Sequence, residues 1–163
     1  MRVICDTNII IDFAKIKRFD LLKNIFHEVM IPDEVKEELL AGGRGETKQS
    51  DIIKAIDEWI VVKKGTDMLA LESLKAHIGK GEAASIVLYM ETKADFLAVN
   101  DLKARGVAHA MGVKIIGTLG IIGLAKDYGL LKKIGPLLDE LKKIGAYIGD
   151  EVYKRILIDA GEG

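Results

Sequence analysis

Acidic side chains follow two of the short apolar runs in this sequence. Asp6 ends the first run and Asp101 comes shortly after the fourth, while Glu38 and Glu82 lie on stretches with helical periodicity. Carboxylates that are brought close together repel one another, so such a cluster is stable only if its members take up protons or hold a cation. Hard oxygen ligands select Mg²⁺ or Mn²⁺, which also bind phosphate oxygens. These acids therefore predict a metal site for a phosphodiester, provided that the fold brings them together.

Each acid also has an ordinary structural explanation. Asp6 and Asp101 could cap helices or form turns, because Asp favours both positions. Glu82 lies in a first helical turn, where a negative charge complements the helix dipole. Glu38 is less easily explained in this way, since a helix places it about 60° from Val35, at the border of the apolar stripe. Taken singly, the acids leave both explanations open.

Apolar runs alternate with helical stretches along most of the chain. This alternation predicts an α/β protein with a parallel sheet of about five strands, covered by helices on both faces. The expected strands are Arg2–Cys5, Val29–Ile31, Trp59–Val62, Phe96–Val99 and Val113–Ile116. The expected helices begin near Ile9 and cover Asp33–Ala41, Asp51–Glu58, Met68–Ile78, Glu82–Lys93, Leu102–Met111 and 118–126, with Gly42 and Gly43 as a stop after the second of them.

The last part of the chain adds two further helical patterns, around Pro136 and Gly149. We expect a single compact unit in which residues 1–128 form the α/β domain and residues 129–163 form a C-terminal helical extension packed on it. The apolar side chains from Leu137 to Ile148 also predict a homodimer.

Composition narrows the class of protein. The chain has 163 residues, of which 49% are hydrophobic and 30% charged, which excludes collagen-like, disordered and disulfide-scaffold classes. Its formal charge of −1 gives no overall attraction to a polyanion, so nucleic acid would have to be bound through a local basic surface or a metal. The single cysteine and the lack of a signal-like or membrane-spanning apolar stretch predict a cytoplasmic location.

Four motifs in order resemble those of PIN-domain proteins, in particular a prokaryotic subgroup predicted to bind nucleic acid or act as ribonucleases. Each motif alone is weakly specific, but their order and spacing match over most of the chain. The motifs are Val3-Ile4-Cys5-Asp6-Thr7-Asn8, Ile31-Pro32-Asp33-Glu34-Val35-Lys36-Glu37-Glu38-Leu39, Gly81-Glu82-Ala83-Ala84 and Asn100-Asp101.

The resemblance implies a sheet in the order 3-2-1-4-5 and a metal-dependent endoribonuclease acting on RNA. Acids at the positions of Asp6, Glu38, Glu82 and Asp101 would hold Mg²⁺ or Mn²⁺, and water would attack the phosphorus. Some members of the family are toxins, so an antitoxin protein is an implied partner. Thr7 and Asn8 would orient the first acid, and Asn100 or Thr118 would orient the last.

The sequence departs from the family pattern just after Asp101. Many members carry a further acid a few residues on, where this chain has Ala104 and Arg105. Arg105 could form an ion pair with Asp101 and so suppress the activity of the site, or it could bind a phosphate of an incoming strand. A catalytically weak PIN-like module that binds RNA or protein therefore remains an alternative.

Other candidates have weaker support. Asp95 precedes the fourth strand, which would place it at the opposite end of the sheet from the other acids. His27, His77 and His109 show no metal-ligand spacing, and Cys5 is expected to be a buried, inert thiol. A phosphoacceptor receiver domain would need an Asp after the third strand and a Lys after the fifth, where this chain has Lys63-Lys64-Gly65 and Thr118.

Overall fold

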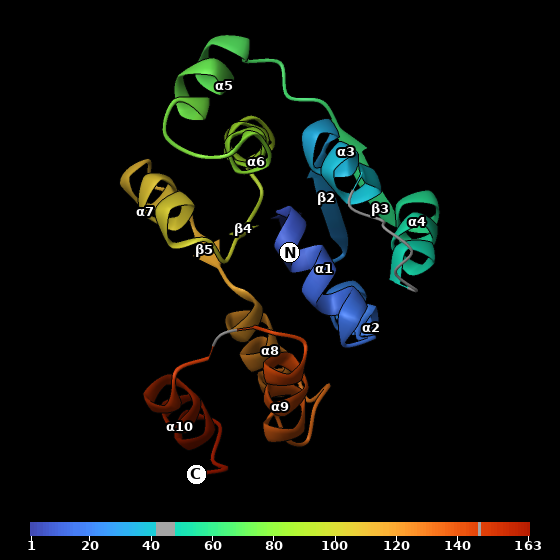
Figure 1. Cartoon of the computed structure of the whole chain (residues 1–163), viewed down its shortest axis with the longest axis vertical. Helices are drawn as coiled ribbons and strands as arrows, with labels where there is room; N and C mark the ends of the chain where they lie inside the picture. Colours follow the sequence, from blue (N-terminus) through green and yellow to red (C-terminus); the bar gives the residue numbers. More distant parts are fainter. Residues whose placement is uncertain (42–47, 147) are drawn as a thin grey trace.

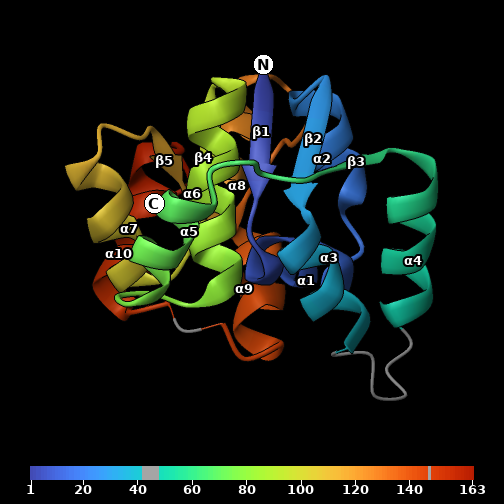
Figure 2. The same ribbon diagram turned by 90° about the horizontal axis from the view of Figure 1, so that it is seen from above.

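A single five-stranded sheet lies at the centre of the protein. The computed structural model describes residues 1–41, 48–146 and 148–163. All pairings are parallel, and the strand order is β3-β2-β1-β4-β5, which confirms the predicted fold class (Figure 2). The strands are β1 (Arg2–Cys5), β2 (Glu28–Pro32), β3 (Ile60–Lys63), β4 (Phe96–Ala98) and β5 (Ile115–Ile116).

Helices connect the strands and continue past the last one (Figure 1). Gly42 and Gly43, expected to stop a helix, lie outside the described residues. The helices are α1 (Thr7–Lys15), α2 (Phe19–Ile25), α3 (Asp33–Ala41), α4 (Lys48–Glu58), α5 (Met68–Lys75), α6 (Lys80–Thr92), α7 (Leu102–Ala110), α8 (Thr118–Asp127), α9 (Gly135–Lys143) and α10 (Asp150–Asp159).

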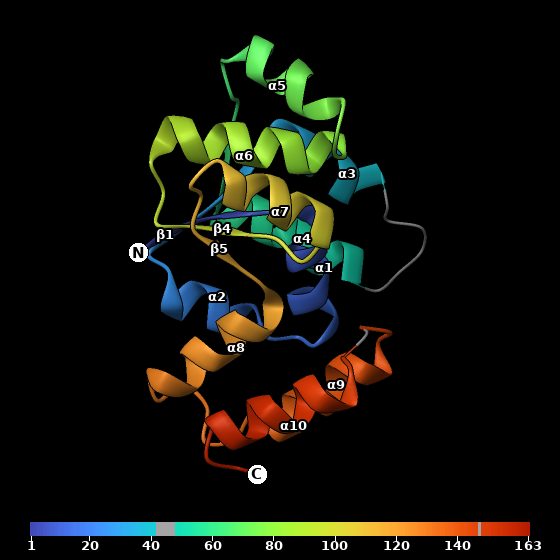
Figure 3. The ribbon, with the colours of Figure 1, turned by 90° about the vertical axis from the view of Figure 1, so that its left-hand side faces the viewer.

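Each face of the sheet has its own apolar core, because successive side chains of a strand point to opposite faces. Val3 and Cys5 of β1 belong to a core shared with α1, α2, α4, α8 and α9. Ile4, between them, belongs to a second core shared with α5, α6 and α7. Figure 3 shows these two groups of helices on opposite sides of the sheet. The sheet is therefore covered on both faces, as the apolar strands predict.

Several predicted boundaries differ from the structure by a few residues, helix α2 was not predicted, and two of the boundary differences are informative. The break expected between the helices before and after Gly79 is present, but α6 begins at Lys80 rather than at Glu82 and so includes Gly81. Strand β5 is shorter than expected, because the amide of Val113 bonds to the carbonyl of Ala108 at the end of α7 rather than to β4. The first difference matters for the site, because Gly81 lies directly beside Glu38.

The C-terminal extension is tied to the rest of the chain. The three leucines of α9, Leu137, Leu138 and Leu141, are buried in the core of one sheet face. After α10, the Glu162 carboxylate accepts hydrogen bonds from Lys126, at 2.7 Å, and from the amide of Ile134. These bonds lower the pKa of Glu162 to about 2. The division of the chain at residue 128 and the homodimer both stay predictions.

Among the described residues, none of the helices combines the length and the apolar character needed to cross a bilayer.

Candidate active site

The carboxyl ends of the two central strands bring Asp6 and Asp101 to one edge of the sheet. β1 and β4 are hydrogen-bonded neighbours, and the Asp6 amide donates to the carbonyl of Ala98 at 3.0 Å. Polar groups that follow adjacent parallel strands meet at the same edge, where open α/β sheets bind ligands. Two flanking helices, α3 and α6, add Glu38 and Glu82 at this edge.

Asp6 is the most buried of the four acids, with only 3% of its surface exposed. Burial raises the pKa of its carboxyl to about 7, against the opposing effect of a hydrogen bond from the Thr7 backbone. The negative charges of Glu82, Glu38 and Asp101 raise this pKa further. All three other acids thus act electrostatically on Asp6, so the structure places the four sequence-predicted residues within electrostatic range of one another at this edge.

Glu38 is held beside Asp6 by a hydroxyl group and a glycine. The Thr7 hydroxyl donates a hydrogen bond to Glu38 Oε2 at 2.5 Å. On the other side, a Cβ atom at Gly81 would lie 2.6 Å from Glu38 Oε1, which is closer than Cβ atoms approach other heavy atoms. Thr7, expected to orient Asp6, therefore bonds to Asp6 through its backbone and to Glu38 through its hydroxyl, and Gly81 leaves the space that the Glu38 carboxylate occupies.

The other two acids turn toward backbone groups at the starts of their own helices. Glu82 accepts a hydrogen bond from the Gly79 backbone, while burial, which is the larger effect, raises the pKa of this carboxyl. Asp101 caps α7, because its Oδ2 accepts from the amide of Ala104 at 2.9 Å. The capping role considered for Asp101 is thus real, whereas Asp6 occupies the N-cap of α1 without a side-chain cap bond.

These acids suit a divalent cation by their chemistry and their charge. Their oxygen atoms are the ligands that Mg²⁺ and Mn²⁺ prefer. Among the described residues, no lysine or arginine forms an ion pair with any of the four. The residues are not a preassembled cage: within the described part of the chain, no group of three or more possible ligand side chains lies close enough to hold a metal ion. A cation would therefore compete with the hydrogen bonds that now hold these carboxylates.

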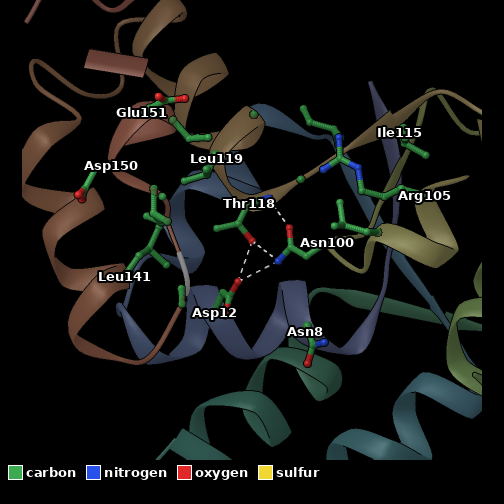
Figure 4. A pocket seen from close by; sticks show the side chains of 18 residues that line it. Asn8, Asp12, Asn100, Arg105, Ile115, Thr118, Leu119, Leu141, Asp150 and Glu151 are labelled. Atoms are coloured by element: carbon green, nitrogen blue, oxygen red, sulfur yellow. Dashed lines mark hydrogen bonds between the residues drawn. The ribbon is translucent and has the colours of Figure 1, made fainter. Parts of the chain in front are cut away.

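A polar network lies beside the acids, and it includes a residue that sequence reasoning missed. Asp12 Oδ2 accepts hydrogen bonds from the Thr118 hydroxyl at 2.8 Å and from Asn100 Nδ2 at 3.1 Å (Figure 4). Asn100 Oδ1 in turn accepts from the Thr118 amide at 2.9 Å. Burial raises the pKa of Asp12, and the two hydrogen bonds oppose this shift. The network joins α1, the segment after β4 and the start of α8.

The position of Asp12 in its helix could have revealed it. Ile9 lies three residues before it and Ile16 four residues after, and both are buried. An acid on the apolar face of a helix needs a hydrogen-bonding partner. Its partners Asn100 and Thr118, expected to orient the last acid, instead bond to Asp12 and to each other.

Arg105 and Asn8 lie beside the acids without contacting them. Within the described residues, Arg105 forms no ion pair with Asp101, and its guanidinium lies next to Gly117, where a Cβ would be 2.9 Å from Nη1. Asn8 is exposed and lines the cavity that also contains Arg105. Of the two roles considered for Arg105, the structure does not contain the pairing with Asp101.

Three other sequence candidates lie outside the site. Asp95 is at the opposite end of the sheet, as expected, where its Oδ2 accepts from the Arg2 amide at 2.6 Å. Cys5 is fully buried, and burial raises the pKa of its thiol well above the ordinary value. It is therefore the inert thiol that the sequence predicts. His27 Nδ1 bonds to the N-terminal amine at the far edge.

Comparison with known families identifies the family to which the chain belongs. The parallel sheet and its acidic carboxyl edge define an α/β protein with a site suited to a cation and a phosphate group. The sequence matches the family model DUF3368, described as a PIN domain, over residues 2–162. The protein therefore belongs to the PIN-domain family. PIN domains are generally nucleases that use divalent metal ions, so membership indicates a nuclease-like function. No curated protein and no solved structure matches the sequence.

Proposed function

We propose that this protein is a metal-dependent endoribonuclease that hydrolyses the phosphodiester bonds of RNA. In this proposal Asp6, Glu38, Glu82 and Asp101 hold Mg²⁺ or Mn²⁺. The observation that carries it is the state of Asp6, a buried acid whose pKa is raised to about 7 and which faces three other carboxylates. An arrangement that costs folding free energy in this way is typical of a functional site. The family indicates a nuclease, which supports the same conclusion.

The chain itself contributes position and charge to the reaction. A divalent cation, when bound, activates water and stabilises the negative charge on the phosphoryl oxygens. Asp6 is shielded from water, so its attraction to a cation is screened less than that of an exposed acid. Thr7 and Gly81 fix the place of Glu38. The Cys5 thiol is buried and stays protonated, so it is not a nucleophile in this proposal.

Arg105 lies on α7, four residues after Asp101. We assign it the second of the roles considered above, which is contact with a phosphate of the bound strand. Its guanidinium is not engaged by Asp101, so it is available for a bidentate contact with phosphate oxygens.

A catalytically weak module that binds RNA or protein is the second candidate. It is favoured by Arg105 in place of a further acid, and by the separation of the carboxylates in the described part of the chain. The two candidate functions differ in whether the protein cleaves the RNA that it binds. A module of this kind would bind RNA without cleaving it, whether or not Mn²⁺ is present.

Cleavage of a labelled RNA separates these candidates. We expect the wild-type protein to cut internally labelled RNA with Mn²⁺ and to stop when EDTA is added. Asp6→Asn should abolish cutting, while Asp95→Asn, at the opposite end of the sheet, should keep it. Cutting that survives both EDTA and Asp6→Asn would contradict the proposal. RNA binding without cutting by the wild type would establish the second candidate.

The toxin role belongs to the same proposal. A ribonuclease of this type that acts as the toxin of a toxin–antitoxin pair should arrest growth when it is expressed alone. An antitoxin expressed with it should restore growth, and Asp6→Asn should make expression harmless. Normal growth during expression of an active enzyme would remove the toxin role and leave the ribonuclease proposal standing.

A further inference from the structure

A large cavity adjoins the acidic edge of the sheet. Its volume is about 1110 Å³, and it lies between α7, β5 and the start of α8 on one side and the α9–α10 region on the other. Asn8 and Leu102, which line it, are close in sequence to Asp6 and Asp101. None of the four acids lines the cavity, but one end of it therefore lies at the residues that follow Asp6 and Asp101.

The walls of this cavity are mostly aliphatic, and their charges are segregated. Figure 4 shows Arg105 and Ile115 on one side, and Asp150 and Glu151 on the other. The network of Asp12, Asn100 and Thr118 lies between them, with its hydrogen bonds made within the protein. Further apolar side chains complete the lining, namely Ile116, Leu119, Leu141, Ile148 and Val152.

We infer that this cavity is a subsite for an unpaired base of the RNA strand, next to the phosphodiester that is cut. The inference rests on the proposed ribonuclease function and names its substrate class as single-stranded RNA. A base is flat and apolar on its faces and carries polar atoms at its edge. It matches aliphatic walls that end in the carboxylates of Asp150 and Glu151, which accept hydrogen bonds from base N–H groups.

The charges orient the strand in one way. Arg105 attracts a phosphate, while Asp150 and Glu151 repel it, so the sugar–phosphate backbone follows the Arg105 side and the base points toward α10. Gly117 leaves room for the guanidinium, because a Cβ there would lie 2.9 Å from Nη1. The backbone thus stays beside the four acids while the base enters the cavity.

The cavity is large enough to admit a single base with its sugar. Its volume of about 1110 Å³ lies just above the range of about 300–1,000 Å³ that is typical of small-molecule sites. A base within a duplex is stacked on both faces and paired at its edge, so it cannot contact the aliphatic walls. The cavity therefore selects unpaired RNA.

Two exposed residues of α10 provide a matched pair of variants. Val152 lines the cavity and is 48% exposed, whereas Ile158 is 66% exposed and lies outside the lining. Each is changed to Glu in the full-length chain carrying Asp6→Asn, so that bound RNA is not cut. Affinity for a fluorescent single-stranded RNA is measured by anisotropy, beside a duplex of the same sequence and a strand with every base removed.

We expect Val152→Glu to weaken binding of the single strand by about tenfold, a typical effect of losing one base contact. Ile158→Glu should change it less than about twofold, and neither variant should affect the duplex or the abasic strand. Equal effects of the two substitutions would overturn the subsite, as would equal losses on the single strand and the abasic strand. Failure of the parent chain to bind any RNA would also overturn it and favour a protein partner for this surface.

The outcomes distinguish this inference from the proposed function. Cleavage by the chain with native Asp6, together with equal affinities of the two Glu variants, would leave the ribonuclease and remove the subsite. Absence of cleavage together with the expected difference in binding would remove the ribonuclease and leave a base-binding cavity.

Discussion

The pKa values of two acidic side chains, one at each end of the sheet, shift in opposite directions. At the amino end, Asp95 accepts a hydrogen bond from the Arg2 amide, and Glu28 lies 3.6 Å from Arg2 and 3.9 Å from Lys63. The backbone bond from Arg2 lowers the pKa of Asp95. At the carboxyl end, burial and three neighbouring acids raise the pKa of Asp6. The same residue types are thus stabilised as carboxylates at one end and destabilised at the other.

This difference separates structural acids from functional ones. A carboxyl with a lowered pKa adds to folding stability at neutral pH, whereas one with a raised pKa subtracts from it. Stability alone explains Asp95 but not Asp6, because an uncharged residue would be more stable at the buried position. A ligand of positive charge accounts for the retention of an acid there.

Loss of a site acid should have the largest effect. We expect Glu38→Gln and Asp101→Asn each to lower Mn²⁺-dependent RNA cleavage by about 100-fold or more, because the acids act as a unit. Glu28→Gln, at the amino end, should change the rate by less than about threefold. Initial rates on one labelled RNA measure all three variants. Similar rates for Glu38→Gln and Glu28→Gln would mean that the two ends do not differ in function.

Asp6→Asn should stabilise the protein when divalent ions are absent. The carboxyl has a pKa of about 7 in the folded chain and an ordinary value of 3.8. Between these values the folded state holds a proton that the unfolded state has released, so its contribution to stability falls as pH rises. Asn does not titrate, and we expect a gain of about 2–4 kcal/mol near pH 8 that nearly vanishes near pH 3.

Urea unfolding in EDTA, measured across this pH range, tests the gain. The informative quantity is the difference between the variant and the wild type, because other groups titrate equally in both. A difference that does not grow between pH 4 and pH 8 would show that Asp6 is not held in a costly state.

Substitutions at two helical glycines distinguish an effect on the geometry of the site from an effect on stability. An alanine Cβ at Gly81 would meet the Glu38 carboxylate, the far end of a flexible side chain, so Gly81→Ala should move that carboxylate and lower cleavage by about tenfold. The helical preference of Ala should offset most of the steric cost. Gly106 has nothing within 4 Å of an added Cβ, so Gly106→Ala should keep the activity and add about 0.5–1 kcal/mol of stability.

Cleavage rates and thermal unfolding of the two glycine variants should be measured together. Unchanged cleavage by a folded Gly81→Ala protein would show that the position of Glu38 is not critical.

The smallest expected effect is that of Asp95→Asn. A lowered pKa gives a stabilising contribution that is present above the ordinary value of 3.8 and is lost as pH falls toward the folded pKa. We therefore expect a slightly lower Tm near pH 7 and no difference in strong acid. A decrease that persists at low pH would mean that Asp95 acts through packing rather than through its charge.

The sheet and its acids could be predicted because their signals are local. Each strand is a short apolar run, and Asp6 and Asp101 come just after two of them, so parallel pairing brings both to one edge. The Asp12 network escaped prediction because Asn100 and Thr118 lie 88 and 106 residues away along the chain. Periodicity marks a helix, but it does not say which side chain of another element will contact it.

The start of α6 and the cavity were missed for related reasons. Glycine disfavours helix interiors, so Gly81 suggested a break, and only the approach of Glu38 explains its presence. The cavity depends on how α10 lies against the α7–β5 region. The apolar pattern of the C-terminal extension predicts its helices but not their placement.

Calorimetric titration with Mn²⁺ tests the central claim most directly. The wild-type protein and the Asp95→Asn variant should bind Mn²⁺ with the same affinity, and the Asp6→Asn variant should show no binding heat over the same range. Binding by the wild type that Asp6→Asn leaves unchanged, or no binding by the wild type, would contradict the assignment of the carboxyl edge as a metal site.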